Sequence, residues 1–408
     1  MVKPSSRWSG MKEPSSFQKS LSTILSEKKK KGINVIDLTE GDPVIFGHKN
    51  QELSKTLIEA AENGWHMYPE QTPYREELKK AISDFEKCYR NVEYNPEDTI
   101  LGAGVANCFQ ILHYSLLEPG DEVVIVEPAH YVGGPTSYWH YFQAKAVTSP
   151  SLEEEEWEPN TDELRKKINE KTKAIVIVNP NNPTGAIYSE KSLKKIIDIA
   201  GENDLPIISD EIYGLITFDG NVAKPTASLS KDVPVIAMSG ISKIFMRTGW
   251  RLGYICLHDP KDKINELSKI IKKVAMLYGH GTTTIPTPIL YAATKTYQGS
   301  IIAGLQMAKE LQKRRDLIMK RIEGIEGLSC VKSKGTLYTF PKVEQIGKVW
   351  KNDEEFMLSL VEEENILFNT GSSYGPSGFG HFRLLLLPDI NILQEALNRL
   401  EHHLKKHS

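Results

Sequence analysis

The chain has 408 residues, of which 40% are hydrophobic and 25% are charged, and its formal net charge is −3. This composition is typical of globular proteins, and the charge balance does not indicate binding to nucleic acid or to an anionic membrane. No apolar run approaches the roughly 18 residues of a membrane span, and the N-terminus has no apolar signal-peptide core. The length predicts two or three domains or lobes.

The chain begins with short elements. Residues 1–16 are polar, with scattered Pro and Ser, and we expect them to form an arm. Residues 17–31 are predicted to be a helix, and residues 34–39 a short strand. The Gly-Asp-Pro sequence at 41–43 predicts a turn after that strand.

Between residues 51 and 297, strand-like apolar runs alternate with helical patterns. The predicted strands are 99–101, 122–126, 174–178, 206–209, 234–238 and 253–257. The predicted helices are 53–63, 75–87, 106–117, 161–169, 189–203 and 261–277. This alternation predicts an α/β domain of three layers, in which helices cover both faces of a largely parallel sheet.

Polar motifs directly follow three of these strands. The Asn- and Pro-rich run 179–185, Asp210 and Lys243 come after the third, fourth and fifth predicted strands. Because ligands of such sheets bind at the carboxyl ends of the strands, we expect these residues to share a site.

The pattern changes towards the C-terminus. A long helix over 303–326 is rich in Lys, Arg and Glu. Strand-like runs at 335–340, 366–368 and 381–387, with a helical stretch at 353–364, predict a second, smaller α+β domain.

The cysteines and histidines give no sign of a disulfide framework or a metal site. The four cysteines form no Cys-x-x-Cys pair, and the eleven histidines form no His-Glu-x-x-His motif. We therefore expect no metal and a reducing, cytoplasmic location.

The most informative stretch, residues 239–254, reads Ser-Gly-Ile-Ser-Lys-Ile-Phe-Met-Arg-Thr-Gly-Trp-Arg-Leu-Gly-Tyr. Small residues around Lys243 let the backbone approach a ligand closely. A lysine amine forms a Schiff base with an aldehyde, and Arg251 can hold a phosphate through two hydrogen bonds. This combination suits a phosphorylated aldehyde, and pyridoxal phosphate is such a molecule.

Further motifs accompany this stretch. In chain order they are Asn-Pro-Thr-Gly ending at Gly185, Asp-x-x-Tyr ending at Tyr213, Ser-Lys ending at Lys243 and Gly-Trp-Arg ending at Arg251. Together they resemble the class I/II aminotransferases, which are pyridoxal phosphate enzymes of fold type I. Within this family, the chain resembles the archaeal alanine aminotransferases in particular. The resemblance covers nearly the whole chain, from residue 38 to residue 383.

The resemblance also implies how the chain is divided. Residues 1–48 would be an N-terminal arm and part of the small domain, 49–300 the large cofactor-binding domain, and 301–408 the small α+β domain. The small domain would thus contain both termini. The active unit would be a homodimer with shared active sites.

The resemblance implies three catalytic residues. Lys243 would hold the cofactor as a Schiff base and, once released, move a proton between the substrate α-carbon and the cofactor. Asp210 would face the pyridine nitrogen, because an adjacent opposite charge favours the protonated ring, which then serves as an electron sink. Tyr213, together with Asn182, would address the ring hydroxyl of the cofactor.

The phosphate of the cofactor needs a cup of N–H donors and cations. The resemblance assigns Ser242 and Arg251 to one side of this cup. Gly104, Val105 and Ala106, at the start of a predicted helix, would form the other side, where the helix end favours an anion. The family commonly has a hydroxyl near position 106 and three positions before the lysine, and this chain has neither.

Four other positions match the family pattern. Tyr131 would stack on the pyridine ring, and Tyr68 would reach a phosphate across the dimer interface, although the glycine usual five residues later is proline here. Arg383 precedes an apolar strand, where an arginine is costly unless it is paired. Together with Gly41 and Asn182, it would bind the α-carboxylate of the substrate.

We therefore expect a pyridoxal phosphate-dependent aminotransferase. The stretch 278–285 contains no arginine, although dicarboxylate-specific relatives often place one there. Alanine is thus the expected donor and 2-oxoglutarate the expected acceptor, with a cation such as Arg7 meeting the second carboxylate. Aspartate or broad specificity is the alternative.

Two other classes stay open on sequence grounds. The same site can carry out elimination or ring closure, as in carbon–sulfur lyases and aminocyclopropane carboxylate synthases. A transcription regulator built on this fold would need a DNA-binding module, whereas only a short polar arm precedes the motifs.

Overall fold

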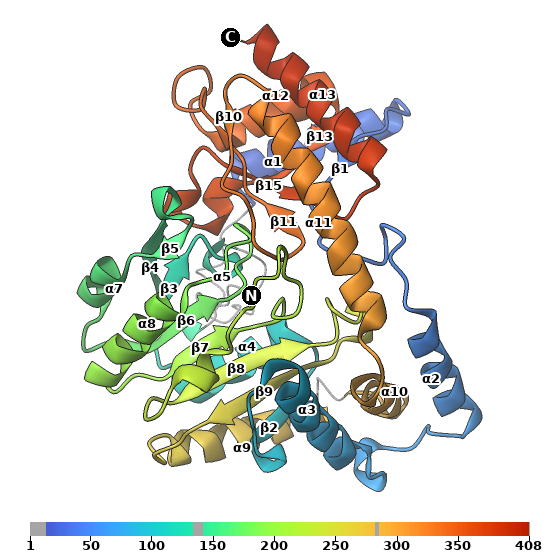
Figure 1. Cartoon of the computed structure of the whole chain (residues 1–408), viewed down its shortest axis with the longest axis vertical. Coiled ribbons are helices and arrows are strands. Elements are labelled where there is room, and N and C mark those ends of the chain that lie inside the picture. Colours follow the sequence, from blue (N-terminus) through green and yellow to red (C-terminus); the bar gives the residue numbers. More distant parts are fainter. Residues whose placement is uncertain (1–13, 134–141, 282–284, 408) are drawn as a thin grey trace, which may run out of the picture.

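The computed structural model describes residues 14–133, 142–281 and 285–407. A wide lower lobe is built around a large sheet, and a narrower upper lobe lies above it (Figure 1). The helices are α1 (Ser16–Lys30), α2 (Gln51–Glu62), α3 (Tyr74–Arg90), α4 (Val105–Leu116), α5 (His130–Gly133), α7 (Thr161–Lys167), α8 (Glu190–Glu202), α9 (Asn265–Gly281), α10 (Thr287–Gln298), α11 (Ile302–Glu323), α12 (Asp353–Glu364) and α13 (Ile390–Lys406). The lower-lobe strands are β2 (Thr99–Gly102), β3 (Glu122–Glu127), β4 (Lys145–Leu152), β5 (Glu158–Pro159), β6 (Thr172–Val178), β7 (Ile207–Asp210), β8 (Val235–Gly240) and β9 (Gly253–His258). The upper-lobe strands are β1 (Ile36–Asp37), β10 (Leu328–Ser329), β11 (Tyr338–Thr339), β12 (Lys342–Val343), β13 (Ile366–Leu367), β14 (Asn369–Thr370) and β15 (Phe382–Leu385).

The lower lobe contains an eight-stranded sheet in the order β2-β9-β8-β7-β6-β3-β4-β5. Strands β4, β3, β6, β7 and β8 are parallel, whereas β9 is antiparallel to both of its neighbours. The chain builds outwards from β3 to β4 on one side and from β6 to β8 on the other. Ligands of such sheets bind at this change of direction, beyond the carboxyl ends of the strands.

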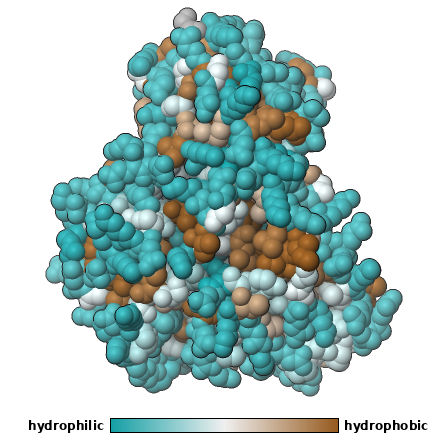
Figure 2. Space-filling view, viewed as in Figure 1, coloured by the Kyte–Doolittle hydropathy of each residue, from teal (hydrophilic) through white to brown (hydrophobic). Residues whose placement is uncertain are grey.

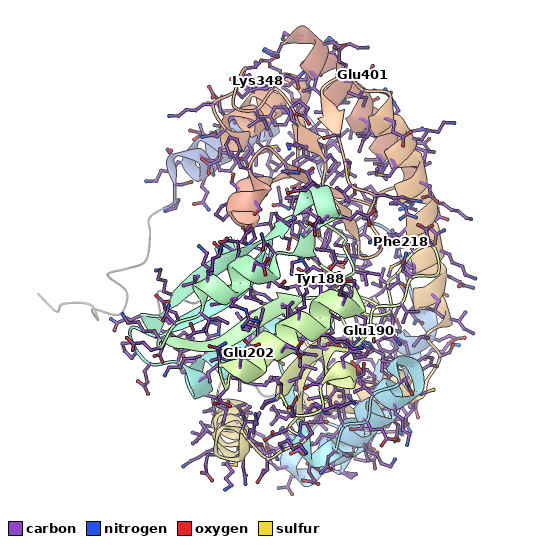
Figure 3. The ribbon with its side chains drawn as sticks, turned by 60° about the vertical axis from the view of Figure 1, so that its left-hand side comes forward. Tyr188, Glu190, Glu202, Phe218, Lys348 and Glu401 are labelled. Carbon is purple, nitrogen blue, oxygen red and sulfur yellow. The ribbon has the colours of Figure 1, made fainter. Side chains whose placement is uncertain are left out.

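Helices cover both faces of the sheet, so the central strands are apolar along their length. On β3, Val123 and Ile125 belong to the core that includes α4 and α9. The alternate residues Val124 and Val126 belong to the core that includes α7 and α8. Figure 3 labels both ends of α8, where it lies across the sheet. The three-layer α/β fold predicted from the sequence is confirmed.

The upper lobe combines the two ends of the described chain. Strand β1 pairs in parallel with β13, and α1 packs against α12. Beside them lies the small sheet β11-β15-β14. The long helix α11 connects the two lobes (Figure 1), and its Arg315 lies 5.0 Å above the ring of Phe218, a residue labelled in Figure 3. The smaller α+β unit is therefore made from both ends of the described chain, as expected for a small domain that contains both termini.

All six predicted strands of the lower lobe are present, but several elements were missed. The sequence analysis did not identify β4, α10 or α13. Strand β4 contains Ser, Thr and Pro, and α10 has a proline in its first turn. The predicted helix 261–277 starts later, at Asn265, because the carboxylate of Asp259 accepts hydrogen bonds from the N–H groups of Lys263 and Ile264.

The surface is mixed in polarity. Figure 2 shows a largely hydrophilic face with apolar patches near the junction of the two lobes. Large apolar side chains that are exposed in the single chain include Ile302 and Leu305 on α11. Among the described residues, no helix is both long enough and apolar enough to cross a membrane.

Candidate active site

One cavity of about 580 Å³ lies at the carboxyl ends of the central strands and is lined from both lobes. Every site residue predicted from the sequence lines this cavity, except Gly104 and Tyr68. The predicted residues in the lining are Gly41, Val105, Ala106, Tyr131, Asn182, Asp210, Tyr213, Ser242, Lys243, Arg251 and Arg383. The fold therefore brings together motifs that lie far apart in the sequence.

Lys243 follows strand β8 and is the single lysine among the described residues of the lining. Its Nζ donates a hydrogen bond of 2.7 Å to the carbonyl oxygen of Gly41. Gly240 is the last residue of β8, and a Cβ there would overlap the carbonyl oxygen of Leu252. The glycine that replaces the family hydroxyl here therefore allows close packing of β8 and β9.

Asp210 ends strand β7 and is buried. Its Oδ2 accepts a hydrogen bond of 2.7 Å from the hydroxyl of Tyr131, and its Oδ1 accepts one of 3.1 Å from the N–H of Ile212. Burial raises the pKa of Asp210 to about 6, although the Tyr131 hydrogen bond acts in the opposite direction. A buried carboxylate in this environment favours a cationic partner.

The turn that carries Asp210 and Tyr213 is held by a buried ion pair. Arg90 Nη2 lies 2.8 Å from Glu211 Oε2, and both side chains are almost fully buried. Gly214 ends the turn against the guanidinium of Arg90, leaving no room for a Cβ. Losing one partner of such a pair typically costs about 3–5 kcal/mol, so the turn has little freedom to move.

The loop 179–185 is also fixed by hydrogen bonds. The side-chain amide of Asn181 donates to the carbonyl of Pro128 at 3.0 Å and to the hydroxyl of Tyr188 at 3.1 Å. Its Oδ1 accepts from the hydroxyl of Thr184 at 2.8 Å. The next residue, Asn182, is thereby directed into the cavity.

Arg383 lies on β15 and is buried. Its guanidinium donates to Asn182 Oδ1 at 3.1 Å and to the carbonyl of Thr39 at 2.6 Å. Its Nε has no hydrogen-bond partner, and Glu40, the acidic residue whose charge acts on it, forms no ion pair with it. A buried cation without a counter-ion is costly, so this position favours an anionic ligand.

A second group of donors that suits an anion lies where α4 begins. Val105 and Ala106 start this helix, and the first N–H groups of a helix have no intrahelical acceptor. Gly104 has a φ of +83°, and a Cβ there would overlap the guanidinium of Arg251. Glycine therefore allows Arg251 to lie against the helix start, and Ser242 lines the same cavity.

These features agree with the comparisons with known proteins. The family model for aminotransferases of class I and II matches residues 33–400. The chain belongs to the class I and II aminotransferases. It is therefore an enzyme that transfers amino groups, and members of this family use pyridoxal phosphate.

Several relatives are similar to this aminotransferase over nearly its whole length. A solved structure of an alanine aminotransferase from Pyrococcus furiosus has 38% sequence identity and a TM-score of 0.90, covering 99% of this chain and 100% of that one. A glutamate-pyruvate aminotransferase of Haemophilus influenzae is 31% identical and covers 91% of each chain. An aspartate aminotransferase of Bacillus subtilis is 31% identical and covers 94% of each chain.

The sequence analysis missed several residues of the aminotransferase cavity. Tyr338, His130, Tyr374 and Thr39 all line it. His130 directly precedes the predicted Tyr131, and this neighbouring position was the sequence signal that could have identified His130. Burial, with Arg383 and Lys243 adding to the effect, lowers the pKa of His130 to about 4, so its imidazole is neutral at neutral pH. Thr39 stands two residues before the predicted Gly41, which was a similar signal, whereas Tyr338 and Tyr374 carried no recognised motif.

Two predicted contributors are not among the described residues of the lining. Tyr68 is 81% exposed in the single chain and does not line the cavity, so its role across a dimer interface stays a prediction. Arg7 of the arm lies outside the described residues, as do the side chains of 278–284. The stacking role of Tyr131 also stays a prediction, because the contact that the structure shows is the hydrogen bond from its hydroxyl to Asp210.

Proposed function

We propose that the chain is a pyridoxal phosphate-dependent aminotransferase that exchanges an amino group between L-alanine and 2-oxoglutarate. The observation that carries the proposal is that Lys243, Asp210 and Arg383 line one cavity. The amine of Lys243 suits the aldehyde of the cofactor. The buried carboxylate of Asp210 suits the ring nitrogen, and the guanidinium of Arg383 suits the substrate carboxylate.

The anion site at the start of α4 fits the phosphate of the cofactor. The free N–H groups of Val105 and Ala106 can donate to phosphate oxygens, as helix N-termini do in many proteins. Arg251 can pair with the same group, because its contact with Gly104 keeps it beside the helix start. The family commonly has two further hydroxyls at this phosphate site, and this chain lacks both. In this proposal the helix-start N–H groups, Arg251 and the Ser242 hydroxyl make the polar contacts in their place.

The opposite part of the cavity fits the ring. Asp210 would pair with the ring nitrogen, and that cation would offset the burial of its carboxylate. Tyr213 and Asn182 would donate to the ring hydroxyl. When bound, pyridoxal phosphate supplies an electron sink for the charge that develops on the substrate α-carbon.

Lys243 and Arg383 would then position the reacting groups. Arg383 is oriented by Asn182 and Thr39, and a carboxylate can pair with its guanidinium through two hydrogen bonds. This fixes the α-carbon beside Lys243, whose free amine can take a proton from that carbon and return one. The hydrogen bond to Gly41 holds the lysine Nζ at this end of the cavity.

The donor follows from the charges in the lining. Arg251 and Arg383 are the arginines among the described residues there, and both already have an anion to hold. Glu40 and Asp42 add negative charge to the same lining. A side-chain carboxylate such as that of aspartate would therefore lack a partner, at a cost of several kcal/mol, whereas the methyl group of alanine meets no such penalty.

The name of one relative supports the same pair of substrates. The Haemophilus influenzae relative is named for glutamate and pyruvate, which on exchange of an amino group become 2-oxoglutarate and alanine. In this proposal a cation outside the described residues, such as Arg7, meets the distal carboxylate of 2-oxoglutarate, which reaches one methylene further than that of aspartate. The Bacillus subtilis relative favours aspartate or broad specificity as the second candidate.

The experiment is a comparison of kcat/KM for alanine and aspartate as donors, with 2-oxoglutarate as acceptor. We expect alanine to be preferred by at least about tenfold, which corresponds to ~1.4 kcal/mol. An aspartate value equal to or above that for alanine overturns the specificity. Repeated release of pyruvate and ammonia from a sulfur-containing amino acid, beyond one equivalent per enzyme and without an amino acceptor, would indicate a lyase instead.

We also propose a homodimer in the cytoplasm, with residues 1–48 and 301–408 forming the small domain and 49–300 the large one. Exposed apolar side chains near Tyr68 support an interface there, since Met67 is 43% exposed in the single chain. Large exposed apolar groups often mark interaction surfaces. Tyr68 would then contribute to the phosphate site of the partner subunit.

A further inference from the structure

Tyr338 joins the two lobes inside the cavity. It lies on β11 in the upper lobe and is 2% exposed. Its hydroxyl oxygen lies 3.1 Å from that of Tyr213, which belongs to the lower-lobe turn after β7. This pair of phenols is therefore a direct contact between the lobe that carries Arg383 and the lobe that carries Asp210.

The ring of Tyr338 lies against Arg383. The guanidinium carbon is 4.2 Å from the ring centroid, a distance typical of a cation–π contact. Strands β11 and β15 are neighbours in the same sheet, which fixes the two side chains side by side. Gly41 lies against the Tyr338 hydroxyl so closely that a Cβ would overlap it. Tyr338 thus contacts residues that hold the substrate carboxylate, the lysine and the cofactor.

The charges around the two phenols differ. Burial acts to raise the pKa of Tyr338, but Arg383, Lys243 and the hydrogen bond with Tyr213 together outweigh it, with Glu40 opposing them, and its pKa lies below the ordinary value. Burial raises the pKa of Tyr213 well above its ordinary value; Tyr338 and Asp210 add to this effect and Arg383 opposes it. The guanidinium of Arg383, which lies against the ring of Tyr338, therefore favours Tyr338 as the donor of the hydrogen bond between the two hydroxyls.

A phenol whose ring lies against a cation is the better hydrogen-bond donor, because the positive field polarises its O–H bond. Tyr338 then donates to the oxygen of Tyr213, and the proton of Tyr213 is left to point into the cavity. This direction matches the role proposed for Tyr213 as a donor to the ring hydroxyl of the cofactor.

We propose that Tyr338 is a positioning residue that couples carboxylate binding at Arg383 to the hydrogen bond that Tyr213 offers to the cofactor. The proposal rests on the proposed aminotransferase function and deepens it. When a carboxylate neutralises Arg383, Tyr338 loses part of the positive field on its hydroxyl. It then donates less strongly to Tyr213, and Tyr213 in turn donates less strongly into the cavity.

The coupling has a measurable sign. A weaker donor at the ring oxygen makes the bound cofactor hold its proton more tightly, so carboxylate binding raises the pH midpoint of its visible absorbance. The charge of the carboxylate also acts directly and in the same direction. By linkage, a rise of one pH unit requires the carboxylate to bind about tenfold more tightly to the protonated form.

The test uses propionate, which has a carboxylate but no amino group to transfer. The pH midpoint of the cofactor absorbance is measured with and without saturating propionate in the wild type, Tyr338→Phe and Tyr374→Phe. Tyr374 is the matched control, because its ring also faces Arg383, at 5.5 Å, whereas the hydroxyl of Tyr213 is bonded to Tyr338. We expect Tyr374→Phe to keep the wild-type rise and Tyr338→Phe to show less than half of it.

A second measurement is independent of the absorbance. The affinity for propionate is measured by calorimetry at one pH below the midpoint and one above it. The difference in affinity between these two pH values should be smaller in Tyr338→Phe than in the wild type. Equal rises in wild type and Tyr338→Phe overturn the proposal, as does an equal loss in Tyr374→Phe. If Tyr338→Phe does not fold, Tyr213→Phe tests the other end of the pair, and a wild-type rise in that variant overturns the coupling. Failure of the proposed function would instead appear as a protein with no cofactor absorbance.

Discussion

Replacing Asp210 with asparagine is expected to stabilise the cofactor-free protein while removing its activity. Burial raises the pKa of this carboxyl to about 6 from an ordinary 3.8. At ~1.36 kcal/mol for each pH unit, the ionised carboxyl costs the folded state about 3 kcal/mol above pH 6. Asparagine keeps groups that can bond to Tyr131 and Ile212, at an expected loss of about 1 kcal/mol. A net gain of about 2 kcal/mol is therefore expected at pH 8.

The dependence on pH distinguishes this cause from others. Below pH 3.8, a carboxyl whose pKa is raised in the folded state is protonated in both states and does not change the free energy of unfolding. That free energy then falls as the pH rises from 3.8 through 6. From the same two pKa values, the advantage of Asp210→Asn at pH 8 should exceed that at pH 5 by about 1.4 kcal/mol. Urea unfolding of both cofactor-free proteins at the two pH values measures it. A variant that is no more stable than the wild type at pH 8, or a gain that does not change with pH, refutes the reasoning.

Three other variants test the assigned roles. Asp210→Ala should lose far more kcat than Tyr213→Phe, for which one hydrogen bond accounts for roughly 1–2 kcal/mol, or about five- to thirtyfold; similar losses in both would contradict the roles. Gly104→Ala should weaken pyridoxal phosphate binding by about tenfold or more, because the φ of +83° is strained for alanine and its Cβ meets Arg251; a titration with unchanged Kd would exclude that cradle. If the sites are shared, inactive Tyr68 and Lys243 variants should regain part of the activity as heterodimers, and verified heterodimers without activity would argue against sharing.

The sheet could be predicted because its central strands are buried on both faces. Such strands are continuous apolar runs that stand out in the sequence, as in β6, which contains Ala-Ile-Val-Ile-Val. Strand β4 has a partly polar sequence and lies near the edge of the sheet, so the same signal was absent. The site residues at strand ends were predictable for a related reason, because the topology of a parallel sheet places them at one edge.

The contacts between the lobes could not be predicted in the same way. Tyr213 and Tyr338 are 125 positions apart, and Arg383 and Thr39 are 344 apart. Tyr338 occupies a short strand that has no distinctive motif. The direction in which each hydroxyl or guanidinium points depends on how the lobes pack, and sequence patterns do not contain that information.

The central claim is that Lys243 holds pyridoxal phosphate covalently through its aldehyde. The most direct test is to load the protein with pyridoxal phosphate, reduce it with borohydride, digest it and locate the modified residue by mass spectrometry. The account predicts one pyridoxyl phosphate group per chain, on Lys243. The Lys243→Ala variant, treated in the same way, should carry no such stoichiometric group. A stoichiometric group on another lysine, or no stable modification of the wild type, would contradict it.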